Sequence, residues 1–398
     1  MTMKALPRGW KIVKLEEIAS PIIEKAGKQK LETLSISAGV GFVNQAIKFG
    51  KELSGKQYVN YSVIRRGDFS FNKGNSRKYP HGCIYKLHDR DIAAVPNAFY
   101  SFKINGQYND YYEQLFISGY LNRQLKKLIN TGVRDDGLFN LYEDDFYNCF
   151  IPLPPISEQR AIAEILTIAD KLIAIKERLI DAKQKQKQWL MRNLLTGKIR
   201  LLGFTDNWER MNLSDTKYFN VNPESNKLPN EFYYIDLESI ESGKLMFKNK
   251  VKKIGAPFRA QRVLSQNDII FQLVRPYLQN NFILNCEFGL PVVASTGYAQ
   301  IRTNQNPIFI FYLIHCDIFL KNSITKSSGS NYPAINVTEL VKINFFLPPL
   351  PEQQAIAEIL TTADREIELL KKELEQQKLI KKYLTQQLLT GKIRVNGA

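Results

Sequence analysis

Two long stretches of this sequence carry apolar residues at helical spacing. Each follows a Pro-rich stop and runs on until Gly197 or Gly391, where a C-terminal cap belongs. Ser157 is placed to cap the first stretch, with Glu158 in its first turn. The spacing of three and four predicts two long helices with a coiled-coil seam. The predicted seam residues are Ile162, Ile165, Ala169, Leu172, Leu179, Leu190 and Leu194 in the first helix, and Ile356, Ile359, Ala363, Ile367, Leu370, Leu374, Leu384 and Leu388 in the second.

These two stretches are copies of one another. Residues 153–200 and 347–394 align without a gap at an offset of 194, and 24 of the 48 aligned pairs are identical. Both copies begin LPP-x-x-EQ and end LLTGKIR. The likeness continues more faintly upstream, where 67–71 (GDFSF) resembles 267–271 (NDIIF). The chain is therefore a tandem of two half-proteins, each a divergent domain followed by a similar helix.

The repeat predicts how the two helices pair. Each helix spans on the order of 40 residues, which is about 60 Å at a rise of about 1.5 Å per residue. An apolar stripe of that length needs a partner, and the other copy is the nearest one. If a two-fold axis relates the halves, the helices run antiparallel, the domains sit at opposite ends, and the chain termini lie close together.

The segments that precede the helices have mixed patterning. Short aromatic or β-branched runs at 83–87, 232–235 and 282–284 predict strands, and 111–129 and 307–324 predict helices. The fold class we expect is α+β, with two mixed α/β domains separated by two long antiparallel coiled-coil helices in a pseudo-two-fold internal repeat. The expected boundaries are 1–151 for the first domain, 152–202 for the central helix, 203–346 for the second domain and 347–398 for the distal helix.

Loops at one topological position differ completely between the two halves. After the matched strands come NKGNSRKYPHG at 72–82 and QLVRPYLQNN at 272–281, whose Arg, Lys, Asn and Gln side chains can recognise base edges. A second pair of loops, at 131–140 and 326–332, offers small donors suited to phosphate oxygens. Ordinary solvated loops are the alternative interpretation. The candidate DNA contacts are Lys73, Asn75, Arg77, Lys78, Tyr79, Arg134, Arg275, Tyr277, Gln279, Asn280, Asn281, Lys326, Ser328, Asn331 and Tyr332.

Composition narrows the class of protein. The formal charge of +16 suggests a polyanionic partner without specifying one. Four scattered cysteines, none at CxxC spacing, and three histidines predict neither a zinc site nor a disulfide framework. No apolar run reaches the length of about 18 residues that a membrane span needs, and the amino terminus lacks the apolar core of a signal peptide. We therefore expect a soluble cytoplasmic protein.

The sequence offers no convincing catalytic, cofactor or metal site. The segment 50–57 (GKELSGKQ) resembles a phosphate-binding loop, but Gln57 stands where Ser or Thr should bind magnesium. There is no GxGxxG after a strand and no Asn-Pro-Pro-aromatic motif. Asp68 and Asp268 occupy matched turns before strands, where capping is a better prediction than metal binding.

The alternation of two dissimilar domains with two similar helices, entered through LPP-x-x-EQ and left through LLTGKIR, closely resembles the specificity (S) subunit of type I restriction-modification systems. The resemblance covers essentially the whole chain. It implies that each domain is a target-recognition domain reading one half of a split, asymmetric DNA site, and that the helices set the unread gap. It also implies that several residues lie in segments near DNA, namely Trp10, Lys73, Asn75, Arg77, Arg275, Tyr277 and Asn331.

The resemblance implies partners as well. The helices would dock two modification (M) subunits, which bind S-adenosylmethionine and methylate adenine, while a restriction (R) subunit would add ATP- and Mg-dependent translocation and cleavage. The chain itself would be non-catalytic, without a cofactor or a membrane partner. Three alternatives stay open: a modification-only or type IIB-like methyltransferase system, a DNA-processing enzyme with a novel site, and a coiled-coil scaffold that pairs only with proteins.

Overall fold

The computed structural model describes residues 7–74, 79–133, 139–224, 227–241, 243–246 and 249–395. The chain divides into two compact units. Unit 1 is discontinuous and comprises 1–176 and 373–398, whereas unit 2 is the continuous segment 177–372. Each unit thus contains one variable domain and one half of each long helix.

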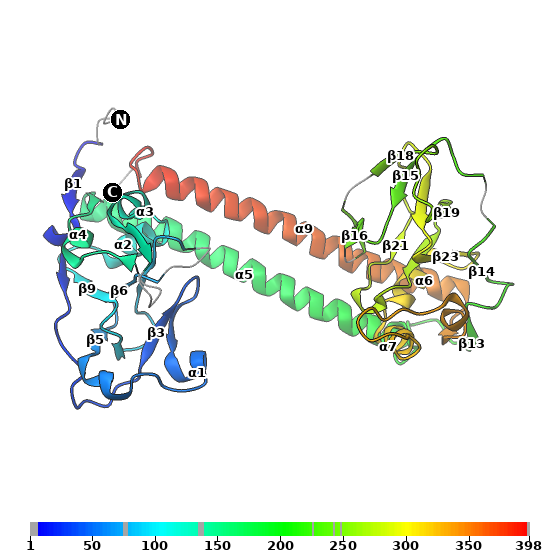
Figure 1. The fold of residues 1–398 in the computed structure, drawn as a ribbon, viewed down its shortest axis with the longest axis horizontal. Coiled ribbons are helices and arrows are strands. Elements are labelled where there is room, and N and C mark those ends of the chain that lie inside the picture. Colours follow the sequence, from blue (N-terminus) through cyan, green and yellow to red (C-terminus); the bar gives the residue numbers. More distant parts are fainter. Residues whose placement is uncertain are drawn as a thin grey trace. The chain divides into compact units, whose positions relative to one another are not determined.

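The two long helices are α5 (Ile156–Leu194) and α9 (Leu350–Leu388), each unbroken over 39 residues (Figure 1). Both are followed by a glycine in the left-handed region, Gly197 at φ 67° and Gly391 at φ 66°, as expected for a C-terminal cap. The start of the first helix differs from the prediction, because α5 begins at Ile156 and Ser157 lies inside its first turn.

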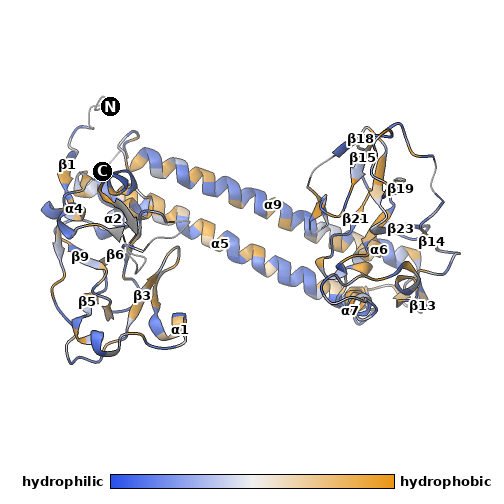
Figure 2. Cartoon of the chain, in the orientation of Figure 1, coloured by the Kyte–Doolittle hydropathy of each residue, from blue (hydrophilic) through white to orange (hydrophobic). Residues whose placement is uncertain are grey.

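The inward face of each helix follows a strict alternation of four and three residues, the spacing of a coiled coil. Polar residues interrupt the apolar ones on this face. Figure 2 shows that hydrophilic and hydrophobic residues alternate along both helices. The buried or half-buried positions are Ile162, Leu166, Ala169, Ile173, Lys176, Ile180, Lys183, Lys187, Leu190 and Leu194 in α5, and Ile356, Leu360, Ala363, Ile367, Leu370, Leu374, Gln377, Lys381, Leu384 and Leu388 in α9. Each position in α9 lies 194 residues after its counterpart in α5.

Four of the predicted seam residues are not on this face. Leu172 is 49% exposed and Leu179 is 41% exposed, and the inward positions belong to their neighbours Ile173 and Ile180. The prediction slipped by one residue there because both members of each pair are apolar. Ile165 and Ile359 lie beside the seam, half-buried against the cores of the two domains. The remaining predicted seam residues all lie on the inward face.

Ion pairs inside each unit give the direction of the helices. In unit 1, Asp170 pairs with Lys381, and Lys176 pairs with Glu373. In unit 2, Lys183 is 2.8 Å from Glu366 and Lys187 is 2.6 Å from Asp364. In both units the residue number falls along α9 as it rises along α5, so the helices are antiparallel. The pairs Asp170–Lys381 and Asp364–Lys187 are equivalent under the repeat, so the two units share the same helix pairing.

Unit 1 is built on a four-stranded antiparallel sheet in the order β2-β9-β6-β7, beside which β1 pairs with β12. Aromatic rings fill its core, with Phe71 and Phe146 stacked at 4.9 Å between centroids. Ile162 of α5 and Leu388 of α9 belong to the same core, so both helices are part of the domain. The strands are β1 (Lys11–Lys14), β2 (Ala19–Pro21), β3 (Leu34–Ser37), β4 (Gly41–Asn44), β5 (Ser62–Arg65), β6 (Phe69–Asn72), β7 (Cys83–Lys86), β8 (Ile92–Val95), β9 (Tyr100–Ile104), β10 (Asn130–Val133), β11 (Phe139–Asn140) and β12 (Phe150–Leu153).

The helical segment predicted at 111–129 is two helices, because Gly119 at φ 74° turns the chain between them. The predicted strand at 83–87 is β7. The helices of unit 1, apart from its halves of α5 and α9, are α1 (Gln45–Phe49), α2 (Asn109–Ile117), α3 (Asn122–Leu128) and α4 (Glu143–Tyr147), with the 3-10 turns η1 (Leu15–Glu17) and η2 (Gly55–Asn60).

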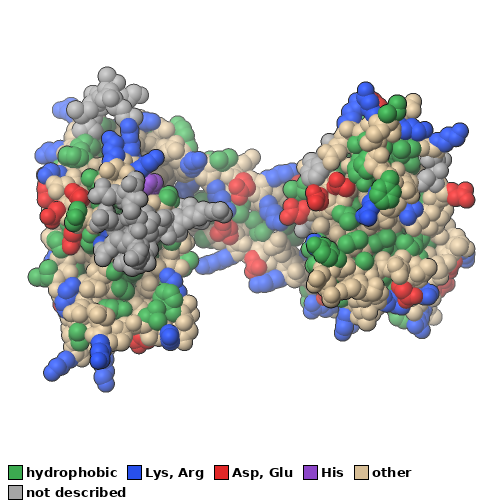
Figure 3. All heavy atoms as spheres, viewed as in Figure 1, with side chains coloured by type: hydrophobic (Ala, Val, Ile, Leu, Met, Phe, Trp, Pro, Cys, Tyr) green, Lys and Arg blue, Asp and Glu red, His purple; other side chains and the backbone are tan. Residues whose placement is uncertain are grey.

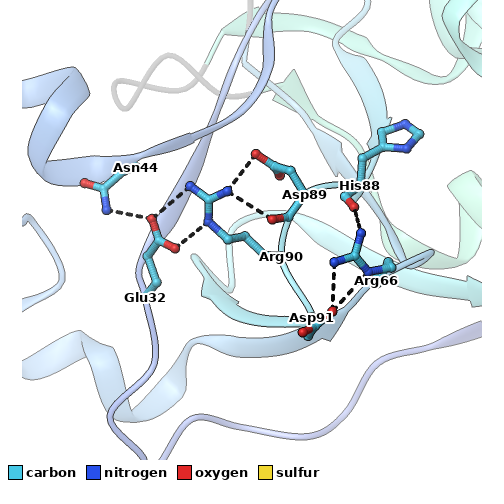
Figure 4. A network of polar contacts seen from close by, with 7 residues as sticks. All are labelled: Glu32, Asn44, Arg66, His88, Asp89, Arg90 and Asp91. Atoms are coloured by element: carbon cyan, nitrogen blue, oxygen red, sulfur yellow. Dashed lines mark hydrogen bonds and ion pairs between the residues drawn. The ribbon is translucent and has the colours of Figure 1, made fainter.

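A polar network joins the segment between β7 and β8 to the rest of unit 1 (Figure 4). Arg90 donates to Glu32 at 2.6 Å and to Asp89 at 2.7 Å, and Glu32 in turn accepts from Asn44 at 2.9 Å. Arg66 closes the other side through Asp91 at 2.8 Å. The Arg90 guanidinium and the Asn44 amide together lower the pKa of Glu32. This network holds the segment between β7 and β8 to the parts of the first domain that carry Glu32, Asn44 and Arg66, and it includes no residue of the loop that follows β6.

Unit 2 repeats the same plan. Its sheet order β14-β23-β20-β21 corresponds to β2-β9-β6-β7, and its pair β13-β24 corresponds to β1-β12. A second four-stranded sheet, β18-β15-β22-β19, has no four-stranded counterpart among the described residues of unit 1. The strands are β13 (Glu209–Asn212), β14 (Phe219–Val221), β15 (Glu231–Ile235), β16 (Ile240–Glu241), β17 (Lys244–Leu245), β18 (Asn249–Lys252), β19 (Ala260–Leu264), β20 (Ile269–Gln272), β21 (Phe282–Ile283), β22 (Val292–Ser295), β23 (Tyr298–Thr303) and β24 (Asn344–Leu347).

The apolar segment predicted at 307–324 also divides in two, at His315 and Cys316. The helices of unit 2, apart from its halves of α5 and α9, are α6 (Pro307–Ile314), α7 (Asp317–Thr325) and α8 (Val337–Leu340), with the 3-10 turn η3 (Pro276–Leu278). In the part of the chain that the structure describes, no single helix has the length and hydropathy of a membrane span; α6 and α7 reach them only together, across a 59° bend. Phe309, Ile310 and Phe319 of this pair are buried in the core.

The matched turns before β6 and β20 have the predicted capping role. The Asp68 carboxylate accepts from the Arg65 amide at 2.7 Å, and the Asp268 carboxylate accepts from the Ser265 amide at 2.6 Å. Asp268 is in addition buried against Arg302, whose guanidinium lies 2.8 Å away. Both carboxylates therefore help to position the strands β6 and β20, each of which is followed by a variable loop.

Candidate nucleic-acid interface

In unit 2 the structure brings together the two loops that the sequence selected separately. Val274 and Ser328 both form β-bridges to Ala334. The Arg275 amide donates to the Pro333 carbonyl at 2.7 Å, and the Ile335 amide donates to the Leu273 carbonyl at 3.0 Å. The loop after β20 and the loop after α7 therefore form one hydrogen-bonded surface, which we call the unit 2 loop surface (272–281 and 326–335).

Aromatic and basic side chains lie on this surface. The Arg275 guanidinium lies 4.2 Å from the centroid of the Tyr332 ring. Tyr332 is 66% exposed and Tyr277 is 47% exposed, and Asn331 is exposed beside them. Such a group can stack on bases or donate to them, which is the chemistry expected of a DNA-reading loop.

The backbone of the same loop is strained. Among the described residues other than glycine, four have positive φ, and two of them are Arg275 at 54° and Gln279 at 53°. The other two are asparagines, which tolerate this region better. Each such residue costs about 1–2 kcal/mol. The loop conformation must therefore be held by its surroundings, as is common at functional sites.

Two of the predicted DNA contacts, Asn281 and Gln279, hold this loop conformation through hydrogen bonds beneath the surface. Asn281 is only 2% exposed; its side-chain oxygen accepts from the Gln272 amide at 2.8 Å, and its nitrogen lies 3.3 Å from the His315 ring. Gln279 donates to the His315 carbonyl at 3.2 Å. Burial lowers the pKa of His315, whose Nδ1 lies 2.6 Å from the Phe311 carbonyl. The structure thus places Asn281 and the Gln279 amide in loop support instead of on the exposed surface.

The positive charge of the loop that follows α7 is partly neutralised. Lys326 pairs with Glu339 at 2.9 Å, and Lys342 pairs with the same carboxylate at 2.8 Å. Hydrogen bonds from these two lysines lower the pKa of Glu339 to about 2. The backbone amide and carbonyl of Ser328 both bond to Ala334 at 2.9 Å. Ser328 therefore offers only its exposed side chain to a ligand.

The equivalent loop of unit 1 follows β6. The Lys73 ammonium lies 4.1 Å from the Tyr100 ring centroid and donates to the Tyr100 hydroxyl at 3.0 Å. That hydroxyl donates to the Leu141 carbonyl. Tyr79 packs partly buried against a small core cluster. In unit 2, the candidate Asn280 is half-buried. The candidates outside the described residues are Asn75, Arg77, Lys78 and Arg134.

Trp10, which the resemblance implies lies in a segment near DNA, is buried. Its ring is 6% exposed and its indole N–H donates to the Glu158 carboxylate at 2.8 Å. The Glu158 carboxylate also accepts two hydrogen bonds from Arg394, one from Nε at 2.7 Å and one from Nη2 at 2.9 Å. In unit 2 the equivalent trio is Trp208, Glu352 and Arg200.

We call these trios the closing clusters. In each, the Glu of the LPP-x-x-EQ motif at the start of one helix binds the Arg of the LLTGKIR motif at the end of the other. The neighbouring Gln159 and Gln353 accept from the Tyr108 and Asn306 amides at 3.0 Å and 3.1 Å, where α2 and α6 begin. The identity of both motifs in the two copies was a signal of this role that residue-type reasoning missed. The cluster of unit 1 also joins segments from the first and last parts of the sequence, since Arg394 donates to the Arg8 carbonyl at 3.0 Å.

Side chains of Lys and Arg are spread over the visible face of each unit (Figure 3). No group of three or more His, Cys, Asp or Glu residues within the described ranges could hold a metal ion. The Arg, Tyr and Asn side chains of the unit 2 loop surface are suited to binding a ligand by charge, stacking and hydrogen bonds.

Comparison with known proteins agrees with this architecture. The family model described as "Type I restriction modification DNA specificity domain" matches twice, over residues 7–183 and 206–379. Two relatives come from Methanocaldococcus jannaschii. The type I restriction enzyme MjaVIII specificity subunit is 28% identical over 68% of this chain and 68% of its own length. The putative type I restriction enzyme MjaX specificity subunit is 26% identical over 98% of this chain and 95% of its own length.

Solved structures show the same fold. A chain of a type I R-M system superposes with a TM-score of 0.60 at 18% identity, covering 98% of this chain and all of its own length. The HsdS subunit from Thermoanaerobacter tengcongensis gives 0.54 at 19% identity, with 98% and 99% covered. The S subunit from M. genitalium gives 0.54 at 14% identity, with 95% and 96% covered. With a family model matched in both halves and the closing clusters repeated in both units, the chain belongs to the type I restriction-modification DNA specificity subunits, which determine the DNA sequence that is recognised and carry no catalytic centre.

Proposed function

We propose that this chain reads a bipartite, asymmetric DNA site, one half with each variable domain. The observation that carries the proposal is that two units with the same strand order present different loops at the same position, after β6 and after β20. A common scaffold with unlike loops is suited to reading two unlike half-sites. The domain boundaries that we propose for this purpose are 1–151 and 203–346.

The charge of the chain supports DNA as the ligand. A formal charge of +16 favours a polyanion, and phosphate neutralisation by Lys and Arg supplies affinity without sequence choice. Sequence choice then falls to side chains that reach base edges. Arg275, Tyr277, Asn331 and Tyr332 are the described candidates for that role, together with Lys73 in the first domain.

We further propose that the chain assembles with two modification subunits and with restriction subunits. S-adenosylmethionine would then be bound by the modification subunits, and ATP and Mg by the restriction subunits. A cytoplasmic location remains our expectation. The exposed sides of α5 and α9 are the surfaces we assign to partner docking, because they carry solvent-exposed Leu172, Ile175 and Leu369.

The lengths of α5 and α9 are proposed to set the unread gap between the half-sites. Removing Ile173–Leu179 from α5 together with Lys371–Gln377 from α9 tests this directly. Each deletion removes one heptad, so Ala169 and Ile180 become spaced as seam neighbours and the Asp170–Lys381 pair keeps its register. Seven residues correspond to about 10 Å of helix, and hence to about 3 base pairs of DNA.

We expect methylated-adenine mapping, in cells that carry the modification subunit and this variant, to return the same half-sites with a gap about 3 base pairs shorter. A heptad insertion at the same two places is the matched control and should lengthen the gap by the same amount. An unchanged gap with intact half-sites refutes the ruler. Absence of any motif that depends on the wild-type chain refutes the proposed function itself.

A further inference from the structure

We propose that Arg275 recognises a guanine in the half-site read by the second domain, with its guanidinium oriented by Tyr332. The inference rests on the proposed function, since it assigns one base of a site that the domain is proposed to read. It starts from the unit 2 loop surface, where the Arg275 guanidinium lies 4.2 Å from the exposed Tyr332 ring.

The Arg275 side chain is positioned by stacking and not by a carboxylate. Within the described residues, no ion pair involves Arg275, and its buried Nε has no hydrogen-bond partner. Two other basic residues near this domain's loops differ: Arg302 is paired with Asp268 and Lys326 with Glu339. The charge of Arg275 is thus available to an external acceptor, whereas theirs is already neutralised.

The backbone fixes where this side chain begins. Arg275 has φ 54°, and its amide is tied to the Pro333 carbonyl at 2.7 Å. The same bond connects Arg275 to the loop that carries Tyr332. A strained residue that is held from both sides is typical of a preorganised contact, because neither the loop nor the stack needs to be rebuilt when a ligand binds.

Three of the four side-chain amides in the loop at 272–281 are engaged in its support. The Gln272 side chain donates to the Val274 carbonyl at 2.6 Å, and the Gln279 side chain donates to the His315 carbonyl at 3.2 Å. Asn281 is buried between the Gln272 amide and His315. These three amides, which could otherwise read adenine, are therefore occupied, and Arg275 is the charged donor of this loop.

Guanine is the base that fits a guanidinium. Its O6 and N7 are adjacent acceptors in the major groove, and the fork of an arginine can donate to both. A tyrosine stacked beneath the guanidinium holds its plane, which a lysine could not exploit. A phosphate would also accept from Arg275, but it would carry no base preference, so the two ligands are separable by experiment.

The test compares methylome motifs produced by the complete modification complex with the wild-type chain, Arg275→Lys, Arg275→Ala and Arg259→Ala. Arg259 is the matched control, because it is an exposed arginine of the same unit whose guanidinium lies 5.6 Å from the Phe258 ring centroid. We expect both Arg275 variants to relax one G·C position of one half-site while every other position is kept. The Arg259 variant should return the wild-type motif.

A binding measurement with 7-deazaguanine at that position gives a second readout that does not depend on a variant folding. Removing N7 should weaken binding of the wild-type complex by about fivefold or more, and should leave the Arg275→Ala complex unaffected. The inference is overturned if the half-site keeps its G·C requirement in both variants, or if Arg275→Ala weakens all sequences equally, as a phosphate contact would. A wild-type chain that yields no bipartite motif overturns the proposed function instead.

Discussion

Replacing Arg394 by Ala should destabilise the domain at the opposite end of the sequence. Arg394 is the fifth residue from the carboxyl terminus, yet its guanidinium binds Glu158 and the Arg8 carbonyl inside unit 1. The substitution leaves the Glu158 carboxylate, 2% exposed, with the Trp10 indole as its remaining described donor. We therefore expect the loss to fall on unit 1 and not on unit 2.

The size of the effect follows from burial. Removing one partner of a fully buried ion pair costs about 3–5 kcal/mol. The Arg394 side chain is 42% exposed, so water can partly replace it, and about 2–3 kcal/mol is the better expectation. For a unit of this size each kcal/mol lowers the melting temperature by about 2–4 °C. The expected decrease is therefore about 4–12 °C for the transition of unit 1.

Hydrogen exchange resolved along the sequence is the assay, because it assigns the loss to particular strands. Arg394→Ala should speed exchange in β1, β12 and the sheet of unit 1, with unit 2 unchanged. Arg200→Ala is the mirror control: its guanidinium binds Glu352 in unit 2, so the faster exchange should appear in β13 and β24. Faster exchange in unit 2 on loss of Arg394, or no change in either unit, would refute the assignment of the closing clusters.

Two further outcomes test other parts of the structure. Ile180→Ala should lower the free energy of unfolding by about 2–4 kcal/mol because Ile180 is 7% exposed on the helix seam, whereas Leu179→Ala, at 41% exposure, should cost about 0.5 kcal/mol or less; equal losses in chemical denaturation would contradict the seam register. Glu339→Gln should release Lys326 and raise non-specific DNA affinity, with a salt dependence steeper by about one unit. An unchanged salt dependence of DNA binding for Glu339→Gln would show that Lys326 does not face DNA. Because the pKa of Glu339 is lowered to about 2, its carboxylate stays charged and pairs with Lys326 at neutral pH. The stability that this pair contributes is lost only as the pH falls from 4.5 through about 2.

The helices and the repeat could be predicted because the sequence contains its own comparison. The gapless offset of 194 fixed both helices, and the antiparallel arrangement followed from symmetry. The seam was mistaken at Leu172 and Leu179, since apolar residues at 172, 173, 179 and 180 fit two stripes equally well. The second copy held the answer, because the equivalents of Leu172 and Leu179 are Glu366 and Glu373, which belong on an outer face.

The candidate site was predictable in position but not in role. Loop composition selected Arg275 and Asn281 alike, and only packing separates the half-buried Arg275, whose guanidinium lies over the exposed Tyr332 ring, from Asn281, which is 2% exposed. The joining of the loops at 272–281 and 326–335 depends on β-bridges that leave no trace in residue type. Trp10 illustrates the same limit: a tryptophan near a chain end is consistent with stacking on a base, yet its indole completes a buried cluster.

The discontinuity of unit 1 has a consequence for biosynthesis. A ribosome makes residues 1–176 before it makes Leu388 and Leu389, whose side chains complete the apolar core of unit 1. Unit 2 is one continuous segment, and all of it is made before Leu388. The core of the domain encoded first therefore cannot be completed until unit 2 has been synthesised, and a premature stop before Leu388 removes part of the core of unit 1.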